Sequence, residues 1–291
     1  MRIGIHIPPT IAPDRLRELA VATERSGLDE LWVWEDAFKQ SGVASATAAL
    51  AWTDRIRVGI SLLPVPLRNP ALTAMEFATL GRMFPGRFVA GIGHGVQPWM
   101  AQAGVKAASP LTLLREQATA IRSLLAGETV TTAGRYVNLD QVRLDWPPEQ
   151  PVPLLIGGSG PKSIALAAEL GDGNLFTNAL TDDQVRDQIQ EVRAAKRAAG
   201  RPDADRPEIA VAEILATGPD AQARLDAELP IWGAEPGQGI GIAGGAAEVV
   251  ASAERYASFG VTSYGIQPAA DEPDLPGFIE LLGEARSKIN S

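Results

Sequence analysis

Short apolar runs alternate with helix-like patterns along the whole chain. Eight runs have the length and residue types of β-strands, over residues 3–7, 31–34, 56–63, 88–92, 154–156, 175–177, 209–216 and 261–266. Helical spacing follows each of them, in segments that end near residues 26, 52, 83, 126, 171, 199, 259 and 289. Eight strand–helix units predict an α/β protein with a closed (β/α)8 TIM barrel, and an open doubly wound sheet is the alternative.

Three stretches interrupt this alternation, near residues 97–110, 128–152 and 230–245. The second contains the pattern of a small hairpin over residues 129–146, and the third is a long loop rich in glycine. Long loops in a compact domain are usually functional or disordered. We expect a single domain over residues 1–291, with these stretches as insertions.

Residues 153–173, PLLIGGSGPKSIALAAELGDG, predict a strand, a glycine turn and a helix that starts at Pro161. Glycines let a backbone approach a ligand closely, and a helix start attracts anions. With Lys162 and Ser163 nearby, the turn suits a phosphate. It matches neither the Walker loop nor GxGxxG, so a plain turn without a ligand is the alternative.

Several reactive side chains fall at the carboxyl ends of the predicted strands, where barrels carry their sites. The only two histidines, His6 and His94, follow the first and fourth strands, and Glu35 and Asp36 follow the second. Singly, His6 could be a buried hydrogen-bonded residue and Asp36 a helix cap. Together with the glycine turn, they indicate a site on this rim.

Composition excludes several classes of function. The net charge of −9 argues against nucleic acid or an anionic membrane surface as a partner. Without cysteine there are no disulfides or thiolate metal sites, and no residue cluster suggests a metal. No signal peptide or membrane span is evident, so we expect a cytoplasmic protein. A phosphate anchor with few acid–base groups fits a cofactor that carries the chemistry.

Five segments together resemble the bacterial luciferase-like family of flavin- and deazaflavin-dependent barrel oxidoreductases. They are LAVATERSGLDELWVWEDAF (19–38), DRIRVGISLLPVPLRNP (54–70), GRFVAGIGHG (86–95), residues 153–173 and GGAAEVVASAERYASFGV (244–261). The resemblance implies a barrel with an insertion. It also implies a homodimer, which is the habit of the family.

The resemblance also implies roles for single residues. It places a cis peptide bond between Ser61 and Leu62, in a bulge that supports the cofactor ring. It places Asp36 near the reactive ring, followed by Ala37 where many deazaflavin enzymes have histidine. The cofactor-binding residues that we expect are His6, Glu35, Asp36, Ser61, Leu62, His94, Gly95, Gly158, Ser159, Gly160, Lys162 and Ser163.

The WEDAF and LRNP segments resemble the coenzyme F420 branch of the family more than the FMN monooxygenase branch. F420 implies hydride transfer to or from a small organic substrate, with Asp36 and His94 as catalytic groups and His6 as a third candidate. FMN would imply oxygen activation, and a non-catalytic cofactor-binding barrel is a further alternative.

Two features bear on the substrate. Related glucose-6-phosphate dehydrogenases carry a glutamate where this chain has Val96, which argues against that substrate. Trp34, Trp52, Trp99 and residues 230–245 could wall an apolar pocket, although tryptophans at alternating strand positions are more often core residues.

Overall fold

Eight parallel strands close into a barrel in the computed structural model, which describes residues 1–158 and 160–289. Around the ring they are β1 (Arg2–His6), β2 (Glu30–Val33), β3 (Arg57–Ile60), β5 (Phe88–Gly93), β8 (Leu154–Gly157), β9 (Gly173–Phe176), β10 (Glu208–Ala216) and β12 (Ser263–Pro268). Pairing of β12 with β1 and of β9 with β10 completes the ring. The predicted (β/α)8 barrel is confirmed, and the open sheet is wrong.

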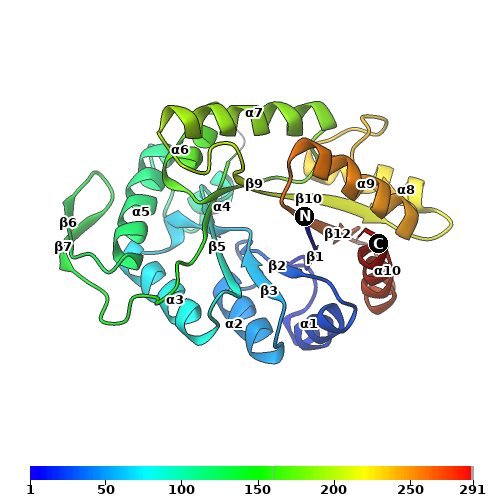
Figure 1. Cartoon of the computed structure of the whole chain (residues 1–291), viewed down its shortest axis with the longest axis horizontal. Helices are drawn as coiled ribbons and strands as arrows, with labels where there is room; N and C mark the ends of the chain where they lie inside the picture. Colours follow the sequence, from blue (N-terminus) through cyan, green and yellow to red (C-terminus); the bar gives the residue numbers. More distant parts are fainter. Residues whose placement is uncertain (159, 290–291) are drawn as a thin grey trace.

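Helices surround the ring of strands (Figure 1). They are α1 (Leu16–Arg25), α2 (Gly42–Trp52), α3 (Pro70–Met83), α5 (Pro110–Leu125), α6 (Pro161–Leu170), α7 (Asp182–Ala198), α9 (Ala246–Phe259) and α10 (Leu275–Ile289). The sequence pattern predicts the first helix from Asp14, but Pro13–Arg15 form a 3-10 turn (η1) and α1 begins at Leu16. Local signals fix other starts, such as the reciprocal capping hydrogen bonds of Thr181 and Gln184 at α7.

The three predicted insertions contain further short elements. The stretch near 97–110 includes α4 (Gln97–Gln102), and 128–152 includes the predicted hairpin, β6 (Val130–Ala133) with β7 (Asn138–Val142). In Figure 1 this hairpin projects beyond α5. Helix α8 (Ala221–Glu228), the 3-10 turn η3 (Leu229–Trp232) and β11 (Ile242–Ala243) follow β10, and only the loop character of residues 230–245 was predicted there. After β3 come β4 (Leu63–Pro64) and η2 (Val65–Leu67).

Side chains of alternate strand residues fill the inside of the barrel. The interior cluster is formed by Trp32, Val89, Leu155, Leu175 and Ala210, each from a different strand. The other face of the strands carries aliphatic residues such as Ile3 and Ile5, which belong to the large core shared with the helices. The interior of the barrel is thus packed with side chains, as the barrel architecture requires.

Among the described residues, none of the helices combines the length and apolar character needed to cross a bilayer.

Candidate active site

A cavity of about 300 Å³ lies at the carboxyl ends of the strands. Eight of the residues expected from sequence line it: His6, Glu35, Asp36, Ser61, Leu62, His94, Gly95 and Gly158. Three others, Gly160, Lys162 and Ser163, lie beside it at the start of α6. Ser159 is outside the described residues. The fold therefore brings side chains from five separate strand ends to one place.

His94 lines this cavity and is joined to Ser163, which lies beside it. His94 Nε2 and Ser163 Oγ are 2.8 Å apart and share a hydrogen bond between the end of β5 and the first turn of α6. A Cβ at Gly158 would lie 2.5 Å from the Ser163 Cβ, so only glycine lets the two segments approach in this way. Burial lowers the pKa of His94, which favours its neutral imidazole at neutral pH.

The start of α6 offers a positive helix end beside this pair. The amides of Ser163 and Ile164 both donate to the carbonyl oxygen of Gly160. These two amides are therefore already used within the turn. The groups left to bind an anion are the Ser163 hydroxyl and the positive end of the helix dipole. Lys162 is exposed, and a Cβ at Gly160 would meet no atom within 4 Å.

Glu35 lines the cavity but is tied into the scaffold. Its Oε2 accepts a hydrogen bond from the amide of Gly42, the first residue of α2, at 2.9 Å. The same oxygen accepts from Arg68 Nη2 at 3.1 Å, and Arg68 also binds Glu76. Glu35 thus holds the start of α2 and neutralises a largely buried arginine.

Asp36 does not cap the helix that follows it. The N-cap of α2 is Ser41, whose side chain accepts from the amide of Ala44. The capping alternative for Asp36 is therefore wrong, because α2 begins at Gly42, well beyond it. The Asp36 carboxylate instead lines the cavity, with Lys39 Nζ 3.6 Å from Oδ2.

His6 is 8% exposed, and burial lowers its pKa to about 3. Its ring centroid lies 5.8 Å from that of Trp32 and 6.2 Å from that of Trp34. A Cβ at Gly265 would lie 2.1 Å from the imidazole, so glycine on β12 makes room for the ring. The ring makes no hydrogen bond to a described residue. The alternative that His6 is simply a buried, hydrogen-bonded residue is therefore not supported.

The peptide bond between Ser61 and Leu62 is cis, as the resemblance predicted, and Ala37–Phe38 is a second cis bond that was not predicted. Ser61 Oγ is buried and has no hydrogen-bond partner among the described residues. The Leu62 side chain lies within 2.5 Å of the Cβ positions that Gly93 and Gly157 lack. Two strand-end glycines thus accommodate the bulge beside the cavity.

Tryptophans form an apolar wall. Trp34 and Trp99 line the cavity, as considered from sequence, whereas Trp52 does not and is partly exposed at the end of α2. Trp232 of η3 also lines it, and its ring meets that of Trp34 edge-on, with 6.5 Å between centroids. The insertion after β10 therefore contributes directly to the site.

Asn178 and Gln267 are polar cavity residues that sequence reasoning missed. Asn178 follows β9, Gln267 lies in β12, and Asn178 Nδ2 donates to Gln267 Oε1 at 2.8 Å. Their positions at strand ends were the available signal, since His6, Asp36 and His94 were found in that way. Among the described residues, no group of three His, Cys, Asp or Glu side chains could hold a metal ion.

A family model described as luciferase-like monooxygenase matches residues 1–269. The chain belongs to this family. It is 35% identical over 204 residues to an F420-dependent glucose-6-phosphate dehydrogenase of Kineococcus radiotolerans, covering 65% of this chain and 60% of that protein. It is 31% identical over 202 residues to a 5,10-methylenetetrahydromethanopterin reductase of Methanolobus tindarius, covering 69% and 61%. The matches thus span about three fifths of these relatives.

Solved structures share the fold of this luciferase-like chain. An F420-dependent secondary alcohol dehydrogenase, in complex with an F420–acetone adduct, matches with a TM-score of 0.87 at 23% identity, over 100% of this chain and 99% of that one. The oxygenating component of a type II Baeyer–Villiger monooxygenase from Pseudomonas putida, in complex with FMN, matches with a TM-score of 0.79 at 18% identity, over 99% and 97%. At these identities the likeness establishes the fold alone.

Proposed function

We propose that this luciferase-like protein is an oxidoreductase that transfers a hydride between coenzyme F420 and a small organic substrate. The observation that carries the proposal is that His94, Asp36 and the Ser61–Leu62 bulge line one cavity, with Ser163 hydrogen-bonded to His94 beside it. The sequence relatives, whose names include F420-dependent dehydrogenases, support the same chemistry.

The cavity fits a cofactor that has both a phosphate and a flat ring. We assign the phosphate to Ser163, His94, Gly158 and Gly160 at the dipole end of α6, with Ser159 and Lys162 as further contacts. We assign the ring to the side of His6, Glu35, Asp36, Gly95 and the Ser61–Leu62 bulge. Ser61 Oγ, which is buried without a partner, suits a polar ring edge. When bound, the deazaflavin supplies a carbon that accepts or donates hydride.

Asp36 is the group that we assign to proton transfer, with His94 as the second. Oxidation or reduction of the substrate requires a proton to move together with the hydride. Asp36 places a carboxyl group at the cavity and caps no helix, whereas burial favours the neutral form of both histidines. We expect Asp36→Asn to retain cofactor binding and to lower turnover a hundredfold or more. Turnover at the wild-type level would remove Asp36 from the mechanism.

An FMN-dependent monooxygenase is the second candidate, because the family description and the FMN-bound structure that shares the fold point to it. Titrating the protein with F420 and with FMN, followed by absorbance and fluorescence, distinguishes the two. We expect tighter binding of F420 and substrate-dependent change of its absorbance near the deazaflavin band. Oxygen consumption with reduced FMN, without reaction of F420, would overturn the hydride proposal.

We further propose that residues 1–291 act as one domain in the cytoplasm, as a homodimer that binds no nucleic acid. The acidic charge opposes nucleic acid. Leu72, Met75 and Met83 are exposed on α3, and an apolar stripe of this kind supports an interface between copies. Light scattering of the wild type and of Met75→Glu tests the homodimer, which should dissociate in the variant.

A further inference from the structure

The cavity has two chemically different sides, which the order of strands separates. His94 and Gly158 follow β5 and β8, the fourth and fifth strands around the ring from β1. Trp34 follows β2, Gln267 lies in β12 and Trp232 belongs to the segment after β10. In the closed ring of eight, β12 lies opposite β5, and β2 and β10 lie two places away from β5 and β8, respectively. A second side of the cavity, formed by other strands than the proposed phosphate site, is therefore walled by different residues.

The tryptophans give this second side an apolar wall that is held in place. Trp232 Nε1 donates to Glu228 Oε1 at 2.8 Å, and the other oxygen of Glu228 accepts from the amide of Ala270 at 3.0 Å. Glu228 is buried, so it ties the α8–η3 segment to the loop after β12. Trp232 then meets Trp34 edge-on. A rigid aromatic pair of this kind binds apolar groups at a low cost in conformational entropy.

The Asn178–Gln267 pair supplies directional hydrogen bonding beside the aromatic wall. Gln267 is 3% exposed, and its one hydrogen bond among the described residues is the 2.8 Å bond from Asn178. Because Asn178 donates to Gln267 through one hydrogen bond, the amino group of Gln267 and the carbonyl oxygen of Asn178 remain available to a ligand. Both side chains line the cavity. A neutral hydroxyl or carbonyl group of a ligand would satisfy them, which buried polar groups require.

Positive charge is missing from the described part of the cavity lining, which contains neither lysine nor arginine. Two carboxylates, Glu35 and Asp36, line it instead, and burial keeps His6 and His94 neutral at neutral pH. An anionic substrate would lose its hydration without gaining a counter-charge, which is costly. Val96 at the rim adds a further apolar contact.

We propose that this side of the cavity selects an uncharged, largely apolar substrate with one hydroxyl or carbonyl group, which packs on Trp34 and Trp232 and bonds to the Asn178–Gln267 pair. The inference rests on the proposed function and names its substrate class. For an alcohol, Asp36 would accept the hydroxyl proton, and bound oxidised F420 would accept the hydride released when the carbinol C–H bond breaks, leaving a ketone.

A matched pair of ligands tests this inference, cyclohexanol and cyclohexanecarboxylate, which share a ring and differ in charge. Binding is measured by tryptophan fluorescence and ligand-observed NMR, both on the protein alone and on the protein saturated with F420. We expect cyclohexanol to bind at least tenfold more tightly than the carboxylate. Equal or tighter binding of the carboxylate, or no saturable binding of cyclohexanol in either form, would overturn the proposal.

Variants test whether cyclohexanol binds at Trp232 and Gln267. Trp232→Ala should weaken cyclohexanol binding at least tenfold, and Trp232→Phe should stay within threefold of the wild type. Gln267→Met should weaken it about fivefold. Trp146→Ala is the matched control, because Trp146 is exposed and stacks on Arg82. Unchanged binding in both Trp232→Ala and Gln267→Met would contradict the assignment.

The outcomes separate this inference from the proposed function. If cyclohexanol binds with the expected preference but no hydride reaches F420, the function fails and the specificity of the cavity stands. If F420 reacts with another substrate while the preference between the two ligands is reversed, the function stands and this inference fails.

Discussion

Protonation of His6, a residue of the cavity, makes the stability of the protein depend on pH. Burial lowers its pKa to about 3, whereas an unfolded histidine titrates near 6.5. Between these values the unfolded chain binds a proton that the folded chain does not, so the free energy of unfolding falls as the pH falls below about 6.5. Between pH 7 and pH 5 the loss from this group is about 2 kcal/mol.

Urea unfolding of the wild type and of His6→Gln at both pH values measures this contribution. His94 is present in both proteins, so the difference isolates His6. We expect the decrease in unfolding free energy from pH 7 to pH 5 to be smaller in the variant by about 2 kcal/mol. An identical decrease in both proteins would show that His6 is not held neutral by burial.

Gly160 permits a direct test of the phosphate assignment, because charge and volume can be changed separately there. A Cβ would meet no atom within 4 Å, and Asp is a favourable N-cap, so both Gly160→Ala and Gly160→Asp should fold. We expect Gly160→Asp to weaken F420 binding at least tenfold by repulsion of the phosphate, about 1.4 kcal/mol or more. Gly160→Ala should bind within threefold of the wild type, and equal losses in both variants would argue against a phosphate at this turn.

At the scale of elements, the segment after β10 is the part of the fold that shapes the site most directly. Glu228 accepts hydrogen bonds from Trp232 and from the backbone of Ala270, and Glu228→Ala would leave both donors without a partner. We expect this variant to lose about 2 kcal/mol or more of unfolding free energy and to bind cyclohexanol more weakly, with unchanged affinity for F420. Glu228→Gln keeps one acceptor oxygen, so its unfolding free energy and its affinity for cyclohexanol should lie between those of the wild type and those of Glu228→Ala. Weaker F420 binding in Glu228→Ala would mean that the segment supports the cofactor side instead.

The same segment shows what the sequence could and could not predict. In other segments, Asn69 and Pro70 predict the start of α3, and Thr181 and Gln184 that of α7, because capping depends on neighbouring residues alone. Helix α8 was missed, since only Ala221, Leu225 and Glu228 of its residues are buried and no apolar stripe marks it. Short polar helices of this kind depend on tertiary packing.

The residues of the candidate site also divide into those that the sequence predicted and those that it did not. Residues that directly follow strands, such as Asp36 and His94, were found because the barrel rule places them at one end. The Asn178–Gln267 contact joins residues 89 positions apart in the sequence, and it exists only once β9 to β12 have taken their places in the ring. Local pattern carries no information about such a pair.

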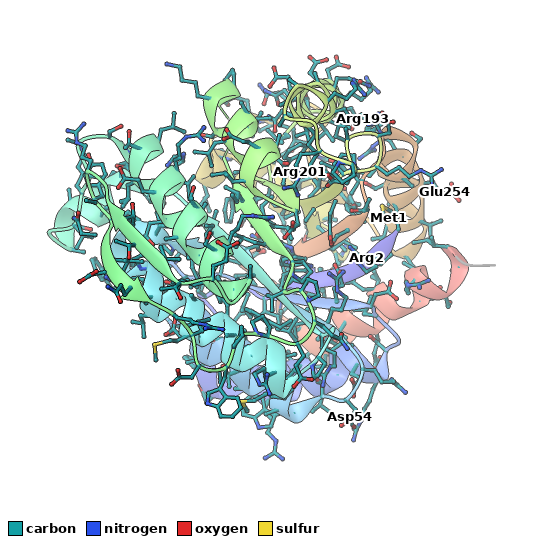
Figure 2. All side chains as sticks on the ribbon, turned by 60° about the vertical axis from the view of Figure 1, so that its left-hand side comes forward. Met1, Arg2, Asp54, Arg193, Arg201 and Glu254 are labelled. Carbon is teal, nitrogen blue, oxygen red and sulfur yellow. The ribbon has the colours of Figure 1, made fainter. Side chains whose placement is uncertain are left out.

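At the scale of the whole molecule, the two ends of the barrel have separate tasks. The amino ends of the strands carry an ion network, in which Glu30 accepts from Arg2, from Arg57 Nη1 at 2.6 Å and from Trp32 Nε1 at 3.0 Å. Glu208 binds the same two arginines. Figure 2 labels Arg2 at the start of β1. The carboxyl ends carry the cavity, on the other side of the interior cluster around Trp32 and Leu175.

This separation predicts that damage to the network costs stability without affecting the site. Glu30 is 1% exposed, and Glu30→Gln would leave Arg2 and Arg57 to share Glu208 alone. Breaking a buried ion pair on one side is strongly destabilising, so we expect a loss of about 3 kcal/mol in unfolding free energy. Affinity for F420, measured in the same preparation below the unfolding transition, should stay within twofold of the wild type.

Glu254→Gln serves as the control, because Glu254 is an exposed carboxylate of α9, labelled in Figure 2. Exposed substitutions of this kind change stability by less than about 0.5 kcal/mol. If Glu30→Gln instead weakened F420 binding as strongly as it lowered stability, the two ends would be coupled through the interior cluster. The cofactor side would then depend on the whole strand layer rather than on the rim alone.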